Sequence, residues 1–156
     1  MRKAGLVRSR VAVVTGLAFS ALCGCACSRP LPTMDIAIRE AVLKVEVAAD
    51  PASRACGLAS RDSLPQDQGM LFVLPEPDEI VFWMQDTRIP LSIAFLDEQG
   101  RILDIHQTRP LQGYERYLSS APARYAIEVN KGWFESHGVA EGELVDIRIP
   151  EHIRIR

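Results

Sequence analysis

The stretch VLKVEVA, residues 42–48, alternates between apolar and polar side chains. Leu43, Val45 and Val47 fall on one face of an extended chain, and the two charged residues between them fall on the other. A period of two residues is typical of a β-strand that buries one face. The stretch therefore predicts a half-buried strand, and with it a fold that is built on a sheet.

The segment that follows predicts a short helix. Asp50 is a residue type that caps the first turn of helices, and Pro51 suits the first helical position. We expect this helix over about residues 51–59. A second helix of one or two turns is expected over residues 131–137, where Gly138 could end it.

Further short strands are expected along the rest of the chain. They lie at residues 69–74, 80–85, 91–97, 101–108, 123–130 and 143–149. Pro75 and Pro77 should end the first of them, residues 98–100 are typical of a hairpin turn, and residues 109–122 predict a long loop. About seven strands with two short helices predict a mainly β fold, a compact antiparallel-rich sandwich or barrel.

The first 24 residues have the order of a secretory signal. A basic flank precedes an apolar run of about 13 residues, 11–23, which is shorter than the roughly 20 that a membrane-spanning helix needs. The segment Leu22–Cys25 resembles a lipobox, which predicts cleavage before Cys25 and lipidation of its thiol. The alternative is ordinary cleavage that leaves Cys25 as a plain thiol. Ala26, rather than Asp, follows the cysteine, which fits sorting to the outer membrane.

The expected mature chain has the size of one domain. Removal of 24 of the 156 residues leaves 132, enough to bury a core. We expect residues 25–40 to be a lipidated tether and residues 41–156 to form a single domain. Because 14 basic and 20 acidic residues remain, the formal net charge becomes −6. An acidic domain without a basic stripe is a poor partner for nucleic acid or for an anionic lipid surface.

Cysteine usage indicates neither a metal site nor a redox pair. There is no CxxC motif and no zinc-ligand spacing, so we expect no metal and no cofactor. Cys27 and Cys56 could form a disulfide in an oxidising periplasm. The favoured alternative is a buried, apolar Cys56 and an unpaired Cys27.

Four segments resemble the motifs of a known family. They are RACGLASR (54–61), GMLF (69–72), FWMQDTRIPLSI (82–93) and IEVNKG (127–132). In this order they resemble the DUF192 family, also called UPF0127, over about residues 42–149. The resemblance implies a compact, mainly β fold, often exported, without an established activity. Ala59 and Ser92 stand where the family usually has Met and Asp, which weakens any mechanism built on position 92.

Two arginines are the first ligand-binding candidates. If the first helix extends to residue 59, Arg54 and Arg61 lie on one face, two turns apart. Their guanidinium groups could then bind a carboxylate or a phosphate together. The alternative is that each arginine pairs with an acidic side chain of the domain, such as Glu128.

Trp83 is a second candidate. In an expected strand it faces opposite to its neighbours Phe82 and Met84. A Trp at a pocket mouth would stack on a sugar or an aromatic ligand, although a place in the core is the commoner role. Met84 and Thr87 join it as ligand-binding candidates, with the alternative that Thr87 only shapes the turn after the strand.

Glu128 lies between Ile127 and Val129 and faces away from both. Three roles are open: a salt bridge with an arginine, a solvated side chain, or a buried carboxyl whose raised pKa would suit acid/base chemistry. Asn130, in the same motif, is a further ligand-binding candidate.

Asp104 and His106 share one face of their expected strand, where the carboxylate could orient a basic imidazole. An exposed hairpin face explains the same pattern. The three histidines of the chain share no metal-ligand spacing.

Three functions fit these observations. The first is a lipid-anchored, non-catalytic envelope module that binds a small ligand, a glycan or a protein partner. The second is an envelope hydrolase or lyase with Glu128 or the Asp104/His106 pair as acid/base. The third is a scaffold or assembly factor without a small-molecule site. We expect a binding protein rather than an enzyme, attached through Cys25 to the periplasmic side of the envelope, most simply at the outer membrane. The oligomeric state stays open.

Overall fold

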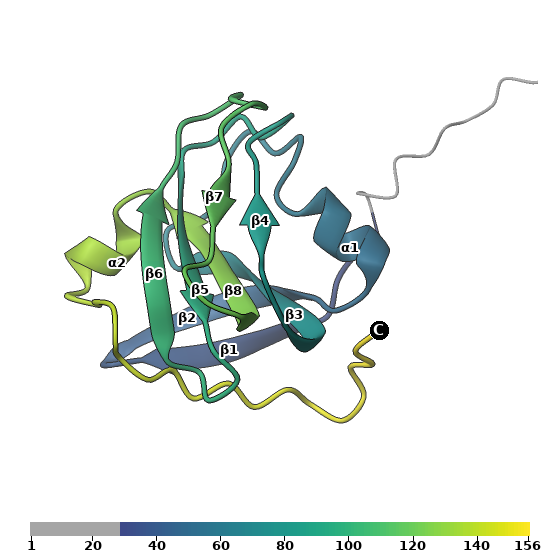
Figure 1. The fold of residues 1–156 in the computed structure, drawn as a ribbon, viewed down its shortest axis with the longest axis vertical. Coiled ribbons are helices and arrows are strands. Elements are labelled where there is room, and N and C mark those ends of the chain that lie inside the picture. Colours follow the sequence, from purple (N-terminus) through teal and green to yellow (C-terminus); the bar gives the residue numbers. More distant parts are fainter. Residues whose placement is uncertain (1–28) are drawn as a thin grey trace, which may run out of the picture.

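The computed structural model describes residues 29–156, which form a mainly β domain (Figure 1). The expected cleavage and lipidation at Cys25 lie outside the described residues, as does Cys27. The strands are β1 (Thr33–Ile38), β2 (Ala41–Ala48), β3 (Gln68–Asp78), β4 (Val81–Phe82), β5 (Leu91–Leu96), β6 (Ile102–Gln107), β7 (Tyr117–Leu118) and β8 (Ala123–Asn130). The helices are α1 (Pro51–Cys56) and α2 (Trp133–Ser136).

Six strands form one mixed sheet in the order β1-β2-β3-β8-β5-β6, and β4 pairs with β7 in a small second sheet. Neighbours in the large sheet are antiparallel, except that β2 and β3 run parallel. A parallel pair needs a crossover connection, and the segment that contains α1 provides it. The expected mainly β, antiparallel-rich fold with two short helices is confirmed. The sheet is open, with β1 and β6 at its edges, so the barrel alternative is excluded.

Apolar side chains cover both faces of the large sheet. Leu43, Val45 and Val47 are buried on the face that also packs against Trp133 of α2, as their alternation predicts. The other face carries a second cluster that includes Phe72 and Leu58, the latter just after α1. Because both faces of β3 are covered, its first half is a continuous apolar run rather than an alternating one.

The expected tether is partly wrong, because the sheet begins before residue 41. Residues 33–38 form β1, which pairs with β2 along its whole length. Ile36 and Ile38 are fully buried in the core. The alternation of this short segment carries the same signal as residues 42–48, but Pro30 and Pro32 just before it suggested a linker.

Several elements end at other residues than expected. Helix α1 ends at Cys56, because Gly57 adopts a φ of +50°. Strand β3 continues through Pro75 and Pro77, and its pairing with β8 shifts register between Val73 and Asp78. A proline cannot donate a hydrogen bond, so it disturbs this pairing without ending the strand.

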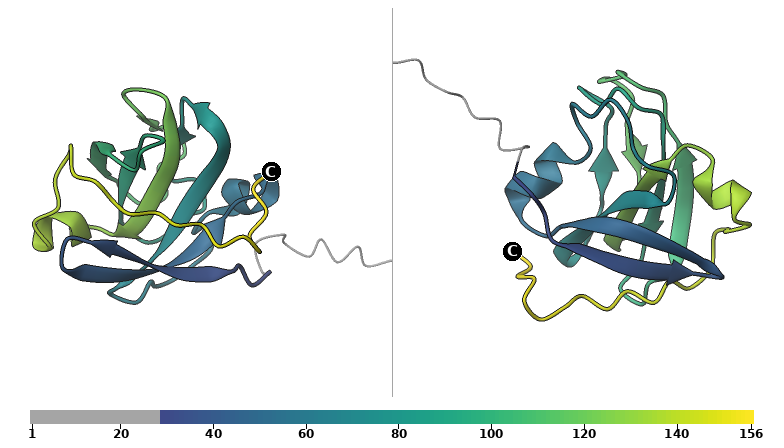
Figure 2. Two further views of the ribbon diagram at one scale, coloured as in Figure 1. Left: turned by 90° about the horizontal axis from the view of Figure 1, so that it is seen from below. Right: turned by 180° about the vertical axis from the view of Figure 1, so that it is seen from behind.

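The other differences concern short pairings. Of residues 80–85 only β4 is a strand, and the expected loop 109–122 contains β7, its partner. Residues 143–149 form isolated bridges instead of a strand, Ala37 with Asp146 and Arg101 with Leu144. Figure 2 shows this C-terminal segment, in yellow, running beside the edge of the sheet toward α1.

Candidate ligand pocket

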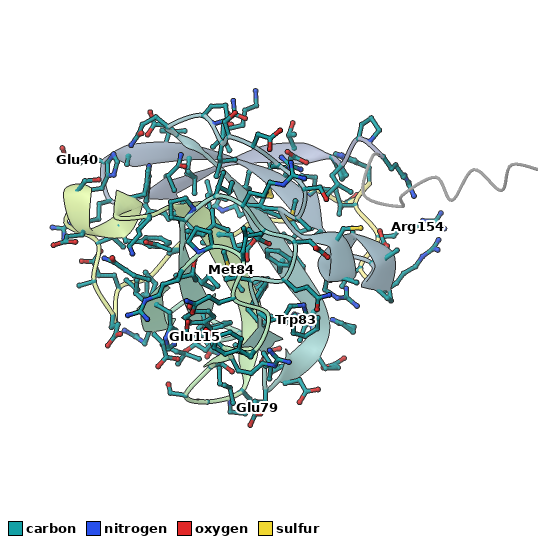
Figure 3. All side chains as sticks on the ribbon, turned by 90° about the horizontal axis from the view of Figure 1, so that it is seen from above. Glu40, Glu79, Trp83, Met84, Glu115 and Arg154 are labelled. Carbon is teal, nitrogen blue, oxygen red and sulfur yellow. The ribbon has the colours of Figure 1, made fainter. Side chains whose placement is uncertain are left out.

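A pocket of about 250 Å³ lies between α1 with its following turn and the chain around β4. Its lining residues are Arg54, Ala55, Cys56, Gly57, Leu58, Ala59, Phe72, Leu74, Glu79, Ile80, Val81, Phe82, Trp83, Gln85, Thr87 and Glu128. Trp83 and Glu79, both labelled in Figure 3, lie on the side of the domain away from α2. All four segments that resemble family motifs contribute side chains, so the pocket is where these distant segments meet.

Helix α1 and its turn form one wall because local sequence fixes both of its ends. Asp50 accepts hydrogen bonds from Ala52 N and Ser53 N, and Ser53 Oγ accepts one from Asp50 N. Gly57 ends the helix and brings the chain close to the sheet. A Cβ atom at Gly57 would lie 3.4 Å from the Phe72 ring and 3.8 Å from Glu128 Oε2.

Glu128 is a buried carboxyl in the wall of this pocket, with 5% of its surface exposed. Its neighbours across the sheet are Met70 on β3 and Ile93 on β5, both apolar. Within the described residues, Glu128 Oε2 has no hydrogen-bond partner. Burial raises the pKa of Glu128 to about 8, against the weaker opposing effect of the Arg61 charge. The side chain is therefore mostly protonated and neutral at pH 7.

Arg61 does not neutralise Glu128, because it is committed to another carboxylate. Strand register places Glu46, Met70 and Glu128 in one row across the sheet. The Nη1 and Nη2 atoms of Arg61 donate to the two carboxylate oxygens of Glu46 at 2.6 and 2.8 Å. This bidentate bond lowers the pKa of Glu46 and raises that of Arg61. The alternative that Glu128 itself forms a salt bridge with an arginine was therefore wrong.

Arg54 lines the pocket but does not act with Arg61 as a pair. Its Nη1 donates to Val73 O at 3.0 Å and its Nη2 to Arg156 O at 2.7 Å. Burial lowers the pKa of Arg54, and the nearby Asp50 charge opposes this. Because α1 ends before Arg61, the two guanidinium groups do not share a helix face. They therefore do not form the expected shared site for a carboxylate or a phosphate.

Trp83 lies at the pocket mouth, with 49% of its surface exposed. The guanidinium of Arg116 lies over its ring, 5.4 Å from the centroid. Trp133 occupies the core instead, so the commoner role expected for Trp83 was wrong. Thr87 is buried and lines the pocket, whereas Met84 is buried among the second apolar cluster and is not part of the lining.

The remaining candidates have structural contacts outside the pocket. Asn130 Nδ2 donates to Leu64 O and Pro65 O. Asp104 accepts a hydrogen bond from Ser120 N, and His106 packs between the rings of Phe95 and Tyr117. Ser92, at the position where the family usually has Asp, accepts a hydrogen bond from Gly132 N.

Cys56 also lines the pocket. It is partly buried and disulfide-bonded, so the expectation of a buried, unpaired Cys56 was wrong. The possible pairing of Cys56 with Cys27 lies outside the described residues.

The sequence interpretation missed Phe72, Phe82 and Glu79 as pocket residues. Two of them stand inside motif segments, which was the available signal, but their apolar surroundings predicted core positions.

Residues 29–156 contain neither a metal-binding cluster nor a helix that could span a membrane. No cluster of three or more His, Cys, Asp or Glu side chains in this range is arranged to hold a metal ion. No helix in the same range combines the length and the apolar character needed to span a bilayer.

The fold and the pocket define a small, mainly β domain with a buried acid in a partly aromatic pocket. The chain belongs to the DUF192 family, described as "Uncharacterized ACR, COG1430", whose sequence model matches residues 34–147. The expected family is thereby confirmed. Among curated proteins no match is found.

Two solved structures are similar to this chain. One is a candidate transcription regulator from Sinorhizobium meliloti 1021, 31% identical, with a TM-score of 0.67 over 72% of this chain and 89% of the other. The second is a protein of unknown function from Novosphingobium aromaticivorans DSM 12444, 27% identical, with a TM-score of 0.67 over 74% and 84% of the two chains.

Proposed function

We propose that this protein is a lipid-anchored, non-catalytic module of the cell envelope that binds a small ligand in the Glu128 pocket. The observation that carries the proposal is the buried carboxyl of Glu128, whose Oε2 lacks a partner within residues 29–156. A buried polar group without a partner costs about 1–3 kcal/mol. A bound group that supplies the missing hydrogen bond offsets this cost, so the pocket favours a ligand over a purely structural scaffold.

Binding is favoured over catalysis because Glu128 is the single buried acid of the pocket lining, and the other acid of the lining, Glu79, is exposed. The nearest carboxylate in its row, Glu46, is held by Arg61. Asp104 and His106 do not line the pocket. The second candidate function is nevertheless an envelope hydrolase or lyase in which Glu128 is the general acid, since a pKa of about 8 keeps its proton available at neutral pH.

The binding test uses the position of Trp83 at the pocket mouth. The chain has two tryptophans, so Trp133→Phe leaves Trp83 as the sole indole fluorophore. Titration of this variant with sugars, wall fragments, amines and small carboxylates should change its fluorescence for a ligand that enters the pocket. The same ligand should raise the unfolding temperature of the wild-type chain. If no member of the panel produces either change, the proposal fails.

The same ligand separates the two candidate functions. An enzyme should convert it, and Glu128→Gln should abolish that turnover because the amide cannot transfer the proton. A binding module should leave the ligand chemically unchanged after prolonged incubation, as judged by mass spectrometry.

The envelope location is proposed from the signal and lipobox-like segment at residues 1–25. In cells that express the chain, Cys25→Ala should move the protein from the membrane fraction to the soluble periplasmic fraction. An unchanged membrane association of this variant would contradict the lipid anchor.

A further inference from the structure

We propose that the Glu128 pocket takes an uncharged, ring-sized group that presents a carbonyl oxygen to the Glu128 carboxyl, as an N-acetylated sugar unit does. This inference rests on the proposed binding function and adds the chemical class of the ligand.

The pocket has room for about one ring of a ligand. The volume of about 250 Å³ lies just below the roughly 300–1,000 Å³ of typical small-molecule sites. Phe72, Phe82 and Trp83 contribute aromatic surface to the lining, on which the apolar face of a ring can stack. Gln85 and Thr87 add polar groups that suit hydroxyl substituents.

The state of Glu128 defines which partner atom is missing. A protonated carboxyl offers one O–H donor, which needs an acceptor. Its sheet neighbours Met70 and Ile93 and the adjacent Phe72 offer apolar side chains. A carbonyl oxygen of the ligand is therefore the complementary group.

Charges around the pocket disfavour an ammonium ligand. Arg54 lies in the lining, Arg61 acts electrostatically on Glu128, and Arg116 covers one face of Trp83. Two acids line the pocket, Glu79 and the neutral Glu128. Glu46 lies outside the lining and is already paired with Arg61. A cation would thus enter a region with more positive than negative charge.

An anionic ligand is also poorly matched. Two guanidinium nitrogens of Arg54 already donate to the backbone carbonyls of Val73 and Arg156, and Arg61 is bidentate with Glu46. The two arginines nearest Glu128 therefore already have acceptors of their own within the described residues. A neutral ligand avoids the cost of an incompletely paired buried charge.

The test compares two sugars that share one ring and differ in charge. N-acetylglucosamine carries an acetamido carbonyl, and glucosamine carries an ammonium group at about pH 6. We expect N-acetylglucosamine to change the Trp83 fluorescence of the full-length Trp133→Phe chain, with at least about tenfold tighter binding than glucosamine. Stronger binding of glucosamine would overturn the inference and leave the proposed binding function intact.

Variants of Glu128 test the hydrogen bond itself. In Glu128→Gln the amide N–H₂ remains a donor at every pH, so binding should persist. In Glu128→Leu the donor is lost, and affinity for N-acetylglucosamine should fall about tenfold or more. Retained affinity in Glu128→Leu, with folding confirmed by circular dichroism, would contradict the assigned contact.

The pH profile gives an independent readout. The charge of Arg61, in the segment after α1, acts on Glu128, and apolar residues of β3 and β5 lie beside it in the sheet. Arg54 and Glu79 are the other charged residues of the pocket lining. Affinity in the otherwise wild-type background should be constant below about pH 7 and fall above about pH 8, as Glu128 loses its proton. Glu128→Gln should flatten this profile, and a profile that falls equally in both proteins would overturn the inference.

A last comparison distinguishes a free sugar from the end of a glycan. If the ligand is the end of a glycan, the β-linked trimer of N-acetylglucosamine should bind more tightly than the monosaccharide. If the ligand is a free sugar, the trimer and the monosaccharide should bind equally.

Discussion

At the scale of single residues, Glu128 is the feature that separates this domain from an inert β-sheet. Its carboxyl lies on the same sheet face as Phe72 and Ala126, in a row between Met70 and Ile93. Arg61 is close enough to act on it electrostatically, yet both of its terminal nitrogens are bound to Glu46. Burial without a full partner is therefore what keeps this acid neutral.

The raised pKa predicts how stability depends on pH. Between the ordinary pKa of 4.5 and the folded value of about 8, the folded chain binds a proton that the unfolded chain releases. The free energy of unfolding should fall by roughly 1.4 kcal/mol per pH unit within this window as pH rises. Glu128→Gln should remove this dependence and be more stable than the wild type near pH 8, as urea unfolding at several pH values can measure. A wild-type stability that rises between pH 5 and 8 would contradict the buried, neutral acid.

Arg61 provides a second residue-scale prediction. Glu46→Gln removes the carboxylate that is paired with this arginine. The positive charge of Arg61 should then interact more strongly with Glu128. The pKa of Glu128 should then fall below that of the wild type, as followed by carbon NMR of its carboxyl. Asp62→Asn is the matched control, because it removes the acid of the exposed pair with Arg88. An equal shift in both variants would contradict a specific effect of Arg61.

At the scale of elements, the pocket depends on how α1 ends. A capping box fixes the start of the helix, and Gly57 turns the chain at a φ of +50°. A residue with a Cβ atom is strained at positive φ by about 1–2 kcal/mol. Glycine at position 57 therefore lets the chain turn here without strain, while an added Cβ atom would make only ordinary contacts with Phe72 and Glu128.

Gly57→Ala should lower the free energy of unfolding by about 1 kcal/mol or more. It should also raise the pKa of Glu128 further, because the new methyl group would lie 3.8 Å from Oε2. Gly142→Ala is the matched control: its φ is +88°, but nothing lies within 4 Å of the added atom. Urea unfolding and carboxyl NMR check both effects, and only Gly57→Ala should change the pKa of Glu128.

At the scale of the whole molecule, the C-terminal segment ties α1 to the core. Ile153 is buried in the same cluster as Trp133. Arg156 N donates to Ala49 O at 2.9 Å, and Arg54 donates to Arg156 O. Figure 1 shows the C-terminus close to α1, so the last residues support one wall of the pocket from outside.

Deletion of residues 153–156 should therefore destabilise the domain. The loss of the buried Ile153, the partly buried Ile155 and three hydrogen bonds should lower the free energy of unfolding by roughly 2–4 kcal/mol. Arg154→Ala, which changes an exposed side chain of the same segment, should have an effect within about 0.5 kcal/mol. Urea unfolding compares the two, and similar values for deletion and substitution would contradict the supporting role.

Elements with a strong local signal could be predicted from the sequence alone. The alternation of residues 42–48, the cap at Asp50 and the apolar run from residue 69 were interpreted correctly, because neighbouring residues set these signals. The two-residue strand β4 was expected to be longer, over residues 80–85, and the two-residue strand β7 was missed. Their pairing joins segments about 35 residues apart, and neither segment carries enough residues to show a period.

The sequence by itself determined a mainly β domain of the DUF192 family and a short set of side chains worth testing. Only the tertiary structure decided between the three roles of Glu128 and placed Trp83 at the surface with Trp133 in the core. The physical reason is that burial and pairing depend on residues that are distant in the sequence. Arg61 could have paired with either of two acids, and the register of β2, β3 and β8 together with the turn at Gly57 left Glu46 as its partner and Glu128 alone.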